Sequence, residues 1–388
     1  MIGCIIGVVI GFLTILFFLS ISKPVKKEKE EIASSEIKLV PKLTEHYLTL
    51  SNYIGQRKKI KYLEGHINLA KLNDAPLPHV LLWGNGGLGK STLMKAVAYE
   101  MGGRFIEIVP ANLRNIKDLF SRFFLKVCYQ CGFANPFSAN TCLKCRNKIG
   151  VYFMPILQLM EKDVIFLEEC HGLKVDIEEA LYSLLQDGYM MLRYNGRDQM
   201  VEFPPITIAG ATTRVGDLNK PFKDRFKIEI HLDPYPINDL MLIGKMYCNN
   251  KGIMITEEPL QVIAEYSFGI PRIVKKYIDD CQTIDNTITI NTIKNLSDLL
   301  DIDENGLDKI HRKILDYIHI RGQAGSSAIA GSVGISTEIF QEVYEPALSL
   351  KEFIWQGNRG RILTLKALNI YYPECNCKNC KKIKENNT

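Results

Sequence analysis

A glycine-rich stretch near residue 85 carries the first residue types that could do chemistry. The apolar run 80–83 predicts a buried strand, and residues 91–100 predict a helix. Between them, the pattern GxxxxGK[ST] is formed by Gly84, Gly89, Lys90 and Ser91. In such a loop, backbone N–H groups surround phosphates, the lysine reaches the β- and γ-phosphates, and the serine ligates Mg²⁺. We therefore predict a nucleoside triphosphate site; a glycine-rich turn without a ligand is the alternative.

Two acidic residues follow a second apolar run, where a nucleotide hydrolase needs carboxylates. Residues 164–167 predict a buried strand that leads directly into Glu168 and Glu169. One carboxylate would hold Mg²⁺ and the next would polarise the attacking water. A third apolar run, 206–209, leads to Thr213 within GATTR. Ligands of open α/β sheets bind at the carboxyl edge, so we expect these groups to meet there. Solvated surface acids are the alternative.

The cysteines raise the question of a disulfide or a metal site. Two Cys-x-x-Cys pairs, with ten residues between them, are formed by Cys128, Cys131, Cys142 and Cys145. In a reducing compartment they predict a Cys4 zinc ribbon over 127–149 that depends on its metal for folding. Four buried small residues are the alternative. A further three thiols lack an evident fourth ligand: Cys375, Cys377 and Cys380. We expect the rest to pack in cores: Cys4, Cys170, Cys248 and Cys281.

The N-terminus indicates the compartment. Residues 1–22 contain no charged side chain, and a helix of that length would span about 33 Å, enough for a bilayer core. Lysines begin only after this segment, so the positive-inside rule places the bulk of the chain in the cytoplasm. A cleavable signal peptide would need a basic segment before a shorter apolar stretch. We therefore expect a single membrane anchor, followed by a charged linker at 23–38.

The length and charge of the chain limit the number of domains and the kinds of partner that can be expected. The chain has 388 residues, of which 46% are hydrophobic and 23% charged, so it can bury more than one core. The formal net charge of +5 permits an anionic partner without requiring one.

Six segments together resemble the RuvB family of AAA+ ATPases, the motors that drive Holliday-junction branch migration. They occur in the family's order: NYIGQ, LLWGNGGLGKST, IFLEECHGL, ITIAGATTRVGDLNKPFKDRF, GIPRIVKKY and VYEPALSLKEFIWQGNRGR. The resemblance covers about residues 39–372. It implies an α/β fold with these parts: a three-layer P-loop domain on a parallel sheet at 39–232, a helical lid at 233–304 and a winged helix at 305–372. The anchor, the ribbon and the Cys/Lys-rich tail at 373–388 are not part of the usual family plan.

The resemblance also implies roles in hydrolysis. Glu169 matches the catalytic carboxylate, Lys90 the phosphate-binding lysine, and Thr213 the sensor that positions the attacking water. Ser91 and Glu168 would hold Mg²⁺. The family, however, has Asp at the position of Glu168. Because the extra methylene displaces the carboxylate by about an ångström at a metal that demands octahedral geometry, we expect slowed hydrolysis.

Other matching positions imply a ring of subunits. Arg225 in KDRF resembles an arginine finger that reaches the ATP of a neighbouring subunit, which implies a homo-hexameric ring. Arg272 in GIPRI resembles a second sensor on the lid. Both arginines join the expected nucleotide-binding set, together with Lys90 and Ser91. The remaining members are Leu39, Ile54, Gly84, Gly87, Leu88, Gly89, Thr92 and Tyr235.

Two further segments imply partners. The wing GNRGR carries Arg359 and Arg361, whose family counterparts contact DNA phosphates. Residues 189–203 match the hairpin that docks on RuvA in the family. Its apolar residues Met190, Met191 and Leu192 would form the docking tip, or they would pack on the sheet.

Two functions from different classes therefore remain open. The first is a ring-forming, ATP-hydrolysing motor that moves branched duplex DNA. The second is a membrane-tethered nucleotide switch or scaffold with slow turnover, which the substitution at Glu168 and the expected anchor favour.

Overall fold

The computed structural model describes residues 49–385, apart from short gaps at 117, 120–123, 129, 132–133, 137–138, 140, 148–152, 156–158, 195–196 and 376. The predicted anchor (1–22), the linker (23–38) and Leu39 lie outside the described residues. Among the helices from residue 49 onward, none has the length and apolar character needed to cross a bilayer.

The large domain is built on a five-stranded parallel sheet with the order β10-β1-β9-β6-β2. Its strands are β1 (Val80–Trp83), β2 (Phe105–Ile108), β6 (Val164–Leu167), β9 (Thr207–Thr212) and β10 (Ile228–His231). The three inner strands are almost wholly buried, which explains their continuous apolar runs. The strands predicted at 80–83 and 164–167 are confirmed, and the one predicted at 206–209 extends to Thr212.

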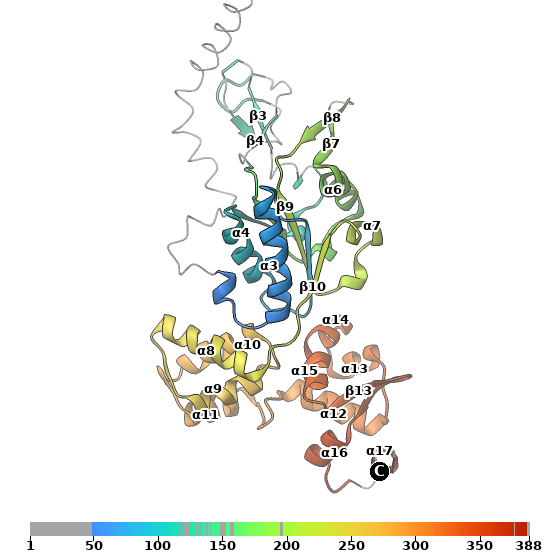
Figure 1. The fold of residues 1–388 in the computed structure, drawn as a ribbon. Helices are drawn as coiled ribbons and strands as arrows, with labels where there is room; N and C mark the ends of the chain where they lie inside the picture. The colour runs from blue at the N-terminus through green and yellow to red at the C-terminus, as the bar shows by residue number, and fades with distance from the viewer. Residues whose placement is uncertain are drawn as a thin grey trace, which may run out of the picture.

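Helices cover both faces of this sheet (Figure 1). On one face lie α3 (Arg57–Leu72) and α4 (Lys90–Met101); on the other lie α6 (Val175–Asp187) and α7 (Lys220–Lys223). Successive β1 residues point to opposite faces, so Val80 and Leu82 join one core and Leu81 joins the other. This confirms the three-layer α/β/α arrangement. Short 3-10 turns connect the layers: η1 (Leu50–Asn52), η2 (Pro110–Asn112), η3 (Cys170–Gly172) and η4 (Val215–Asp217).

Two antiparallel units extend from the large domain. The inserted ribbon is a three-stranded sheet in the order β4-β3-β5, formed by β3 (Phe124–Val127), β4 (Ala134–Pro136) and β5 (Phe153–Pro155). It therefore reaches beyond the predicted limits of 127–149. The hairpin β7 (Tyr189–Tyr194) and β8 (Arg197–Glu202) lies at the same end of the domain as the ribbon (Figure 1).

The predicted lid consists of four helices and a small parallel strand pair. They are α8 (Ile237–Lys251), β11 (Met254–Ile255), α9 (Glu257–Tyr266), α10 (Pro271–Gln282), β12 (Thr287–Ile288) and α11 (Ile290–Leu300). Helix ends follow local signals: α10 begins with Pro271, and Thr289 and Thr292 form a capping box at α11.

A winged helix follows the lid, as predicted. It comprises α12 (Lys309–Arg321), α13 (Ser326–Val333), α14 (Thr337–Ile339), the π-helical turn η5 (Phe340–Tyr344), α15 (Glu345–Leu350), β13 (Ile354–Gly357), β14 (Gly360–Leu363) and α16 (Leu365–Tyr371). The antiparallel strands β13 and β14 form the wing. One helix was not expected: α17 (Lys378–Glu385) forms in the tail and packs on the core of this domain through Cys380.

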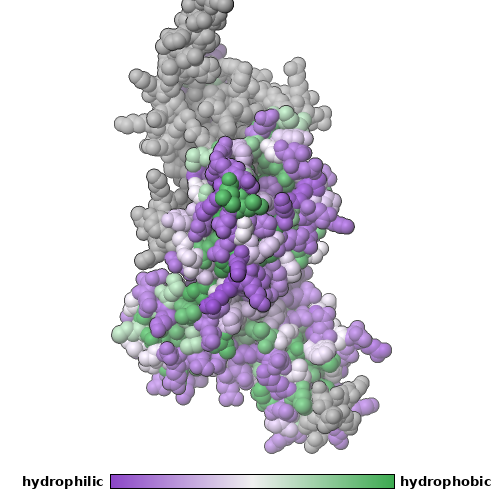
Figure 2. Space-filling model, viewed as in Figure 1, coloured by the Kyte–Doolittle hydropathy of each residue, from purple (hydrophilic) through white to green (hydrophobic). Residues whose placement is uncertain are grey.

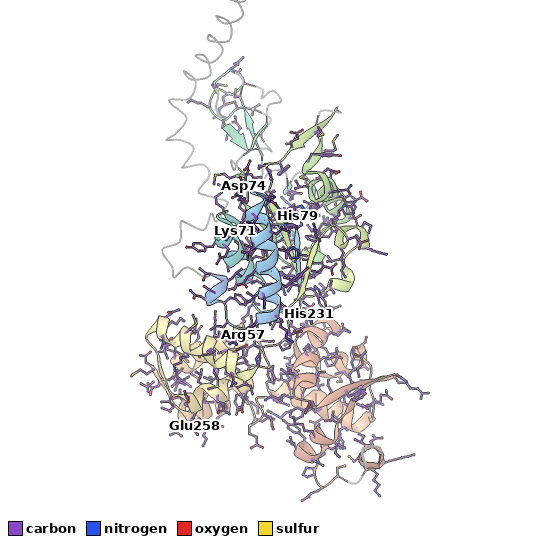
Figure 3. The ribbon with its side chains drawn as sticks, viewed as in Figure 1. Arg57, Lys71, Asp74, His79, His231 and Glu258 are labelled. Carbon is purple, nitrogen blue, oxygen red and sulfur yellow. The ribbon has the colours of Figure 1, made fainter. Side chains whose placement is uncertain are left out.

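The carboxyl edge of the sheet faces both smaller domains. His79 precedes β1 and His231 ends β10, and Figure 3 shows them at opposite ends of the sheet, with His231 next to the lid and the winged helix. The face of the large domain drawn in Figure 2 is mostly hydrophilic. An apolar patch on it lies over the end of α3, where Leu69 and Leu72 are 57% and 84% exposed.

Candidate functional site

A cavity of about 650 Å³ lies between the carboxyl edge of the sheet and the lid. This volume suits a ligand of nucleotide size. Most of the predicted nucleotide-binding residues line it: Ile54, Gly87, Gly89, Lys90, Ser91, Thr92, Tyr235 and Arg272. Gly84 and Leu88 belong to the same loop without lining the cavity, and Leu39 lies outside the described residues.

The glycine-rich loop keeps its shape because two glycines adopt conformations that other residues avoid. Gly84 has φ +139°, and a Cβ there would lie 2.5 Å from the carbonyl oxygen of Leu232. Gly89 has φ +92° and forms the N-cap of α4. The loop therefore passes close to the end of β10 and turns directly into the helix, which leaves backbone N–H groups at the α4 N-terminus free for an anion.

Lys90 supplies a buried positive charge to the cavity. Its Nζ donates to the carbonyl oxygens of Gly84 at 2.8 Å and Asn85 at 3.3 Å, and it lies 3.8 Å from Glu169 Oε1. The residue is only 8% exposed. Burial lowers the pKa of Lys90, and the carboxylate of Glu169 partly opposes that shift. A buried ammonium held by carbonyl oxygens and one carboxylate can transfer its contacts to an incoming phosphate.

Glu169 is held in place by the residue predicted as a sensor. Glu169 adopts a left-handed backbone conformation, with φ 49°, directly after β6. Its Oε2 accepts hydrogen bonds from the backbone N–H of Thr213 at 2.8 Å and from Thr213 Oγ1 at 3.1 Å. Glu168 also lines the cavity. The fold thus brings Lys90, Glu169 and Thr213 together at the ends of three neighbouring strands.

Sequence reasoning missed a histidine and an arginine that extend this network. His171 Nδ1 lies 2.9 Å from Thr212 Oγ1 and 3.3 Å from Glu169 Oε2. Arg214 Nη2 lies 2.7 Å from His171 Nε2. Because a guanidinium only donates, Nε2 must accept, and the imidazole proton is on Nδ1. Burial and the charge of Arg214 lower the pKa of His171, in agreement with a neutral ring.

The same arginine reaches the winged helix. Arg214 Nε lies 3.2 Å from Glu342 Oε1, within η5. A smaller cavity at this contact is lined by residues of the phosphate loop, the sensor segment and the winged helix: Asn85, Gly86, Thr213, Arg214, Asp217, Glu338, Gln341 and Glu342. A chain of polar contacts therefore joins Glu169 to another domain. The only sign of this contact in the sequence is Arg214 itself, the arginine of GATTR, and the sequence does not show which residue it would pair with.

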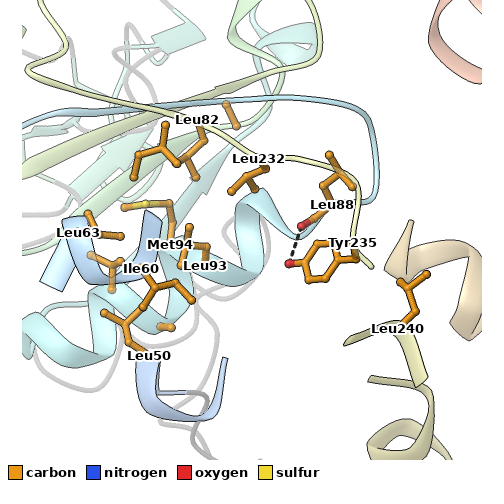
Figure 4. Packing of buried hydrophobic residues seen from close by; sticks show 14 of the residues in the cluster. Leu50, Ile60, Leu63, Leu82, Leu88, Leu93, Met94, Leu232, Tyr235 and Leu240 are labelled. Carbon is orange, nitrogen blue, oxygen red and sulfur yellow. Dashed lines mark hydrogen bonds between the residues drawn. The ribbon is translucent and has the colours of Figure 1, made fainter. Parts of the chain in front are cut away.

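Two tyrosines anchor the loop from outside. Tyr235 donates its hydroxyl to the carbonyl oxygen of Leu88 at 3.2 Å, as Figure 4 shows. Tyr53 donates to Gly89 O at 3.3 Å, and the two hydroxyl oxygens are 3.0 Å apart. Burial raises the pKa of both tyrosines, so both stay protonated donors. Tyr53 was not predicted as a site residue, although it belongs to the NYIGQ segment.

The two predicted arginines occupy different places. Arg272, at the start of α10, lines the cavity and approaches the loop so closely that a Cβ on Gly87 would lie 2.8 Å from Arg272 Cβ. Arg225 follows α7 and does not line the cavity. Its guanidinium lies 4.3 Å from the ring centroid of Tyr182 and donates to the carbonyl oxygen of Pro221. Arg225 therefore cannot serve the nucleotide of its own subunit from this position.

The four ribbon cysteines meet at one point. Their sulfur atoms all lie within 4.8 Å of one another, and the Cys128–Cys145 and Cys131–Cys142 pairs are each 3.5 Å apart without a disulfide. Desolvation raises the pKa of Cys142, but hydrogen bonds from the backbone of Cys145 and Lys144 outweigh it and bring the pKa to about 6. The cluster can present thiolates to a single metal ion.

The wing arginines differ in their surroundings. Arg361 donates from Nε and Nη2 to the two carboxylate oxygens of Glu345 at 2.7 and 2.8 Å, and its side chain is only 13% exposed. Arg359, at the turn of the wing, is exposed. Trp355 on β13 is 65% exposed, which the sequence did not indicate. Of the two predicted DNA contacts, only Arg359 therefore lies where a phosphate could reach it.

The hairpin β7–β8 shows only part of the expected apolar tip. Met190 is fully buried and packs in the core beneath the sheet, so for this residue the structure supports the alternative of packing on the sheet and not the docking tip. Met191 pairs across the strands with Met200, and these side chains are 47% and 58% exposed. An exposed methionine pair remains on one face of the hairpin.

Comparisons with known proteins agree with this arrangement. Residues 46–123 and 147–232 match the family of Holliday junction DNA helicase RuvB P-loop domains, and residues 304–372 match the RuvB C-terminal winged helix domain. The unmatched stretch between the two parts of the P-loop domain contains all four ribbon cysteines.

Relatives and solved structures cover most of the chain. The RuvB subunit of the Holliday junction branch migration complex from Lactobacillus gasseri is 33% identical over 361 residues, which is 89% of this chain and 95% of the relative. Its counterpart from Kosmotoga olearia is 33% identical, over 82% and 87% of the two chains. The structure of the Thermotoga maritima RuvB Holliday junction branch migration motor is 29% identical, with a TM-score of 0.65 over 83% of this chain and 96% of that chain.

Proposed function

This chain belongs to the RuvB family, and from that premise we propose that it is an ATP-driven motor for branch migration of Holliday junctions. The observation that carries the proposal is the meeting of Lys90, Glu169 and Thr213 at one sheet edge beside a cavity of nucleotide size. The curated relatives are named as subunits of a branch migration complex. We infer that this chain acts on branched DNA with a RuvA-like partner, as an assembly of several copies.

Each site residue has a role that its position supports. Lys90 and the N–H groups at the start of α4 hold the phosphates of ATP, and Ser91 with Glu168 hold Mg²⁺, which neutralises phosphate charge when bound. Glu169 polarises the attacking water, since its carboxylate is oriented by Thr213. Arg272 reports the state of the nucleotide to the lid, because it is the first residue after Pro271 at the α10 N-terminus and touches the phosphate loop.

Arg225 acts on the ATP of the adjacent subunit. It does not line the cavity of its own subunit, and its half-buried side chain is held by Tyr182 and the carbonyl oxygen of Pro221. A guanidinium supplied by a neighbour stabilises the negative charge of the transition state and typically contributes 10³-fold or more in rate. Full activity then requires a closed ring, and a homo-hexamer is the assembly that we propose.

The ribbon holds one structural zinc ion in the Cys4 cluster. Zn–S bonds of about 2.3 Å in a tetrahedron place sulfur atoms about 3.8 Å apart, close to the 3.5 Å found for two of the pairs. The ribbon and the Met191–Met200 pair lie at the same end of the large domain, opposite the lid (Figure 1). This end is the proposed docking side for the RuvA-like partner.

Subunit mixing tests the proposal directly. Arg225→Ala retains the cavity but lacks the finger, and Lys90→Ala retains the finger but lacks phosphate binding. We expect ATP hydrolysis by the wild-type chain to be stimulated by a four-way DNA junction, and each variant alone to lose at least about 10³-fold. Mixed subunits should recover part of the activity, because the finger of a Lys90→Ala subunit can then face the intact cavity of an Arg225→Ala neighbour.

Failure of complementation would exclude the trans role of Arg225. Tight ATP binding with negligible turnover in the wild-type chain would favour the alternative, a nucleotide switch, which the glutamate at position 168 supports. The membrane anchor at 1–22 lies outside the described residues and stays a prediction.

A further inference from the structure

A second group of metal-ligating side chains lies where the tail meets the winged helix. Cys375 and Cys377 precede α17, Cys380 lies in its first turn, and His319 comes from the last turn of α12. Their ligand atoms all lie within 4.8 Å of one another. His319 Nε2 is 3.2 Å from Cys380 Sγ and 3.9 Å from Cys377 Sγ, and these two sulfurs are 3.4 Å apart without a disulfide.

We propose that these four residues form a structural Cys3His zinc site that fastens the tail to the winged helix. A tetrahedral zinc ion with Zn–S bonds of about 2.3 Å and a Zn–N bond of about 2.0 Å separates sulfur atoms by about 3.8 Å and sulfur from nitrogen by about 3.6 Å. The two nitrogen–sulfur distances from His319, 3.2 and 3.9 Å, lie on either side of the expected value, and the Cys377–Cys380 sulfur–sulfur distance of 3.4 Å is somewhat shorter than the expected one. Three thiolates and one imidazole select zinc over Mg²⁺ or Ca²⁺, which prefer oxygen ligands.

The imidazole is oriented by contacts outside the cluster. The ring of Tyr372 stacks on His319 with centroids 3.9 Å apart and an interplanar angle of 12°. The Tyr372 hydroxyl donates to Asp316 Oδ1 at 2.7 Å, one turn earlier on α12. A metal-binding histidine requires such support, because its ring must point a chosen nitrogen at the ion. Here the stacking leaves Nε2 directed at the thiols.

The tail backbone is fixed to the same helix end. Asn379 Nδ2 donates to the carbonyl oxygens of His319 and Ile320, each at 3.3 Å. Gly322 leaves the necessary space, since a Cβ there would lie 2.7 Å from the Asn379 side chain. Cys380 is fully buried in the core of the winged helix. Two cysteines of the trio are thus carried by a segment that the fold already places beside His319.

The site explains why so polar a helix packs at the end of the chain. The sequence of α17, KNCKKIKE, contains four lysines and little apolar surface, so it would gain little from burial alone. Zinc coordination supplies folding free energy that such a segment lacks. The consequence is that a strongly basic helix is held against the DNA-facing domain instead of extending from it.

Zinc content of the reduced, full-length chain tests the proposal and separates this site from the ribbon. We expect two zinc ions per wild-type chain and one in the Cys375→Ser/Cys377→Ser/Cys380→Ser variant. A chain with the four ribbon cysteines replaced should also hold one. The matched control is Cys281→Ala, which removes a buried thiol of the lid outside both clusters and should keep two.

Variants at His319 distinguish ligation from packing. His319→Asn should weaken Zn²⁺ binding at the tail by more than about 100-fold, because losing a ligand exceeds the 10- to 100-fold cost of losing an outer contact. His319→Cys should restore binding as a Cys4 site. Co²⁺ titration gives a spectral readout for both. Unchanged zinc content in the tail variant, or a Zn²⁺ affinity of His319→Asn equal to that of the wild-type chain, would overturn the proposal.

Discussion

At the carboxyl edge of the sheet, charged side chains line an open cavity, whereas in the winged helix Arg361 of the wing pairs with the carboxylate of Glu345 on α15. Lys90, Glu168 and Glu169 all have part of their polar surface directed into about 650 Å³ of free space. In the winged helix, Arg361 forms a bidentate pair with Glu345 that leaves 13% and 15% of the two side chains exposed. The charged groups of the cavity are therefore available to a ligand, whereas those of the Arg361–Glu345 pair stabilise the winged helix itself.

This difference has a consequence for DNA binding. A guanidinium whose donors are occupied by a carboxylate cannot also neutralise a phosphate without breaking that pair. If the wing contacts DNA as proposed, Arg359 and the indole of Trp355 are the exposed groups that it offers. In the proposed assembly, several subunits acting together would add to the affinity for a junction, since multivalent attachment strengthens weak contacts. The cavity proposed to bind the nucleotide, in contrast, is lined within one subunit, and only the proposed finger Arg225 would come from a neighbour.

The largest effect is expected in the cavity. Glu169→Gln keeps the shape of the side chain but removes the negative charge that polarises water, so we expect kcat for ATP hydrolysis to fall about 10²- to 10⁴-fold. ATP binding should persist. The matched control is Glu258→Gln, which alters an exposed carboxylate on the lid far from the cavity (Figure 3). Steady-state assays measure kcat, and a nucleotide-binding assay measures ATP affinity. Equal hydrolysis rates for Glu169→Gln and Glu258→Gln would show that Glu169 takes no part in hydrolysis.

The wing gives the next largest effect, on stability. Arg361→Ala strands the Glu345 carboxylate in a nearly buried position, and we expect a loss of about 3 kcal/mol in the free energy of unfolding. Arg359→Ala, two residues away, should change stability by less than about 0.5 kcal/mol but reduce the salt dependence of DNA binding by about one phosphate contact. Chemical denaturation and binding at several salt concentrations measure both. If the two variants exchanged these phenotypes, the contrast drawn between the cavity and the wing would be wrong.

Sequence patterns predicted the parts whose signals are contiguous. The phosphate loop, the strand before Glu168 and the winged-helix order each depend on neighbouring residues, and the structure confirms them. The hydrogen bond between Glu169 and Thr213 is also a consequence of strands ending together, which the parallel-sheet rule anticipates, whereas the left-handed conformation of Glu169 was not predicted.

Contacts between segments that are distant in the chain could not be predicted from the sequence. Arg361 in isolation reads as a DNA contact, because Glu345 lies sixteen residues earlier on another element. The same is true of Arg214 and Glu342, and of His319, which comes from a helix more than fifty residues before the cysteines that it meets. A pattern shows which groups are available, but packing decides which of them are paired. Met190 illustrates the point for apolar residues, since its burial depends on the register of β7 against the core.

A smaller effect is expected at the metal-binding carboxylate. Glu168→Asp shortens the side chain to the length that the family usually carries, and we expect hydrolysis to rise about tenfold. Misplacement by an ångström can cost as much as about 10²-fold, so a gain of this size is within the physical range. The measurement is kcat at saturating Mg²⁺ and ATP, with Glu168→Gln as the control that should lose activity. A fall in rate with Glu168→Asp would show that the loop has adapted to glutamate.

The smallest effect tests whether the cavity and the winged helix are coupled at all. Glu342→Gln removes the charge that meets Arg214 Nε at 3.2 Å, and both side chains are well exposed, so stability should change by less than about 1 kcal/mol. Arg214 also contacts His171, which contacts Glu169. Loss of the Arg214–Glu342 ion pair should therefore lower the stimulation of ATP hydrolysis by junction DNA more than it lowers the basal rate. Glu352→Gln is the matched control, because it removes an exposed ion pair with Lys366 in the same domain. If both variants retain the same ratio of stimulated to basal rate, the polar chain from Glu169 to the winged helix carries no signal, and communication must pass through the lid and Arg272.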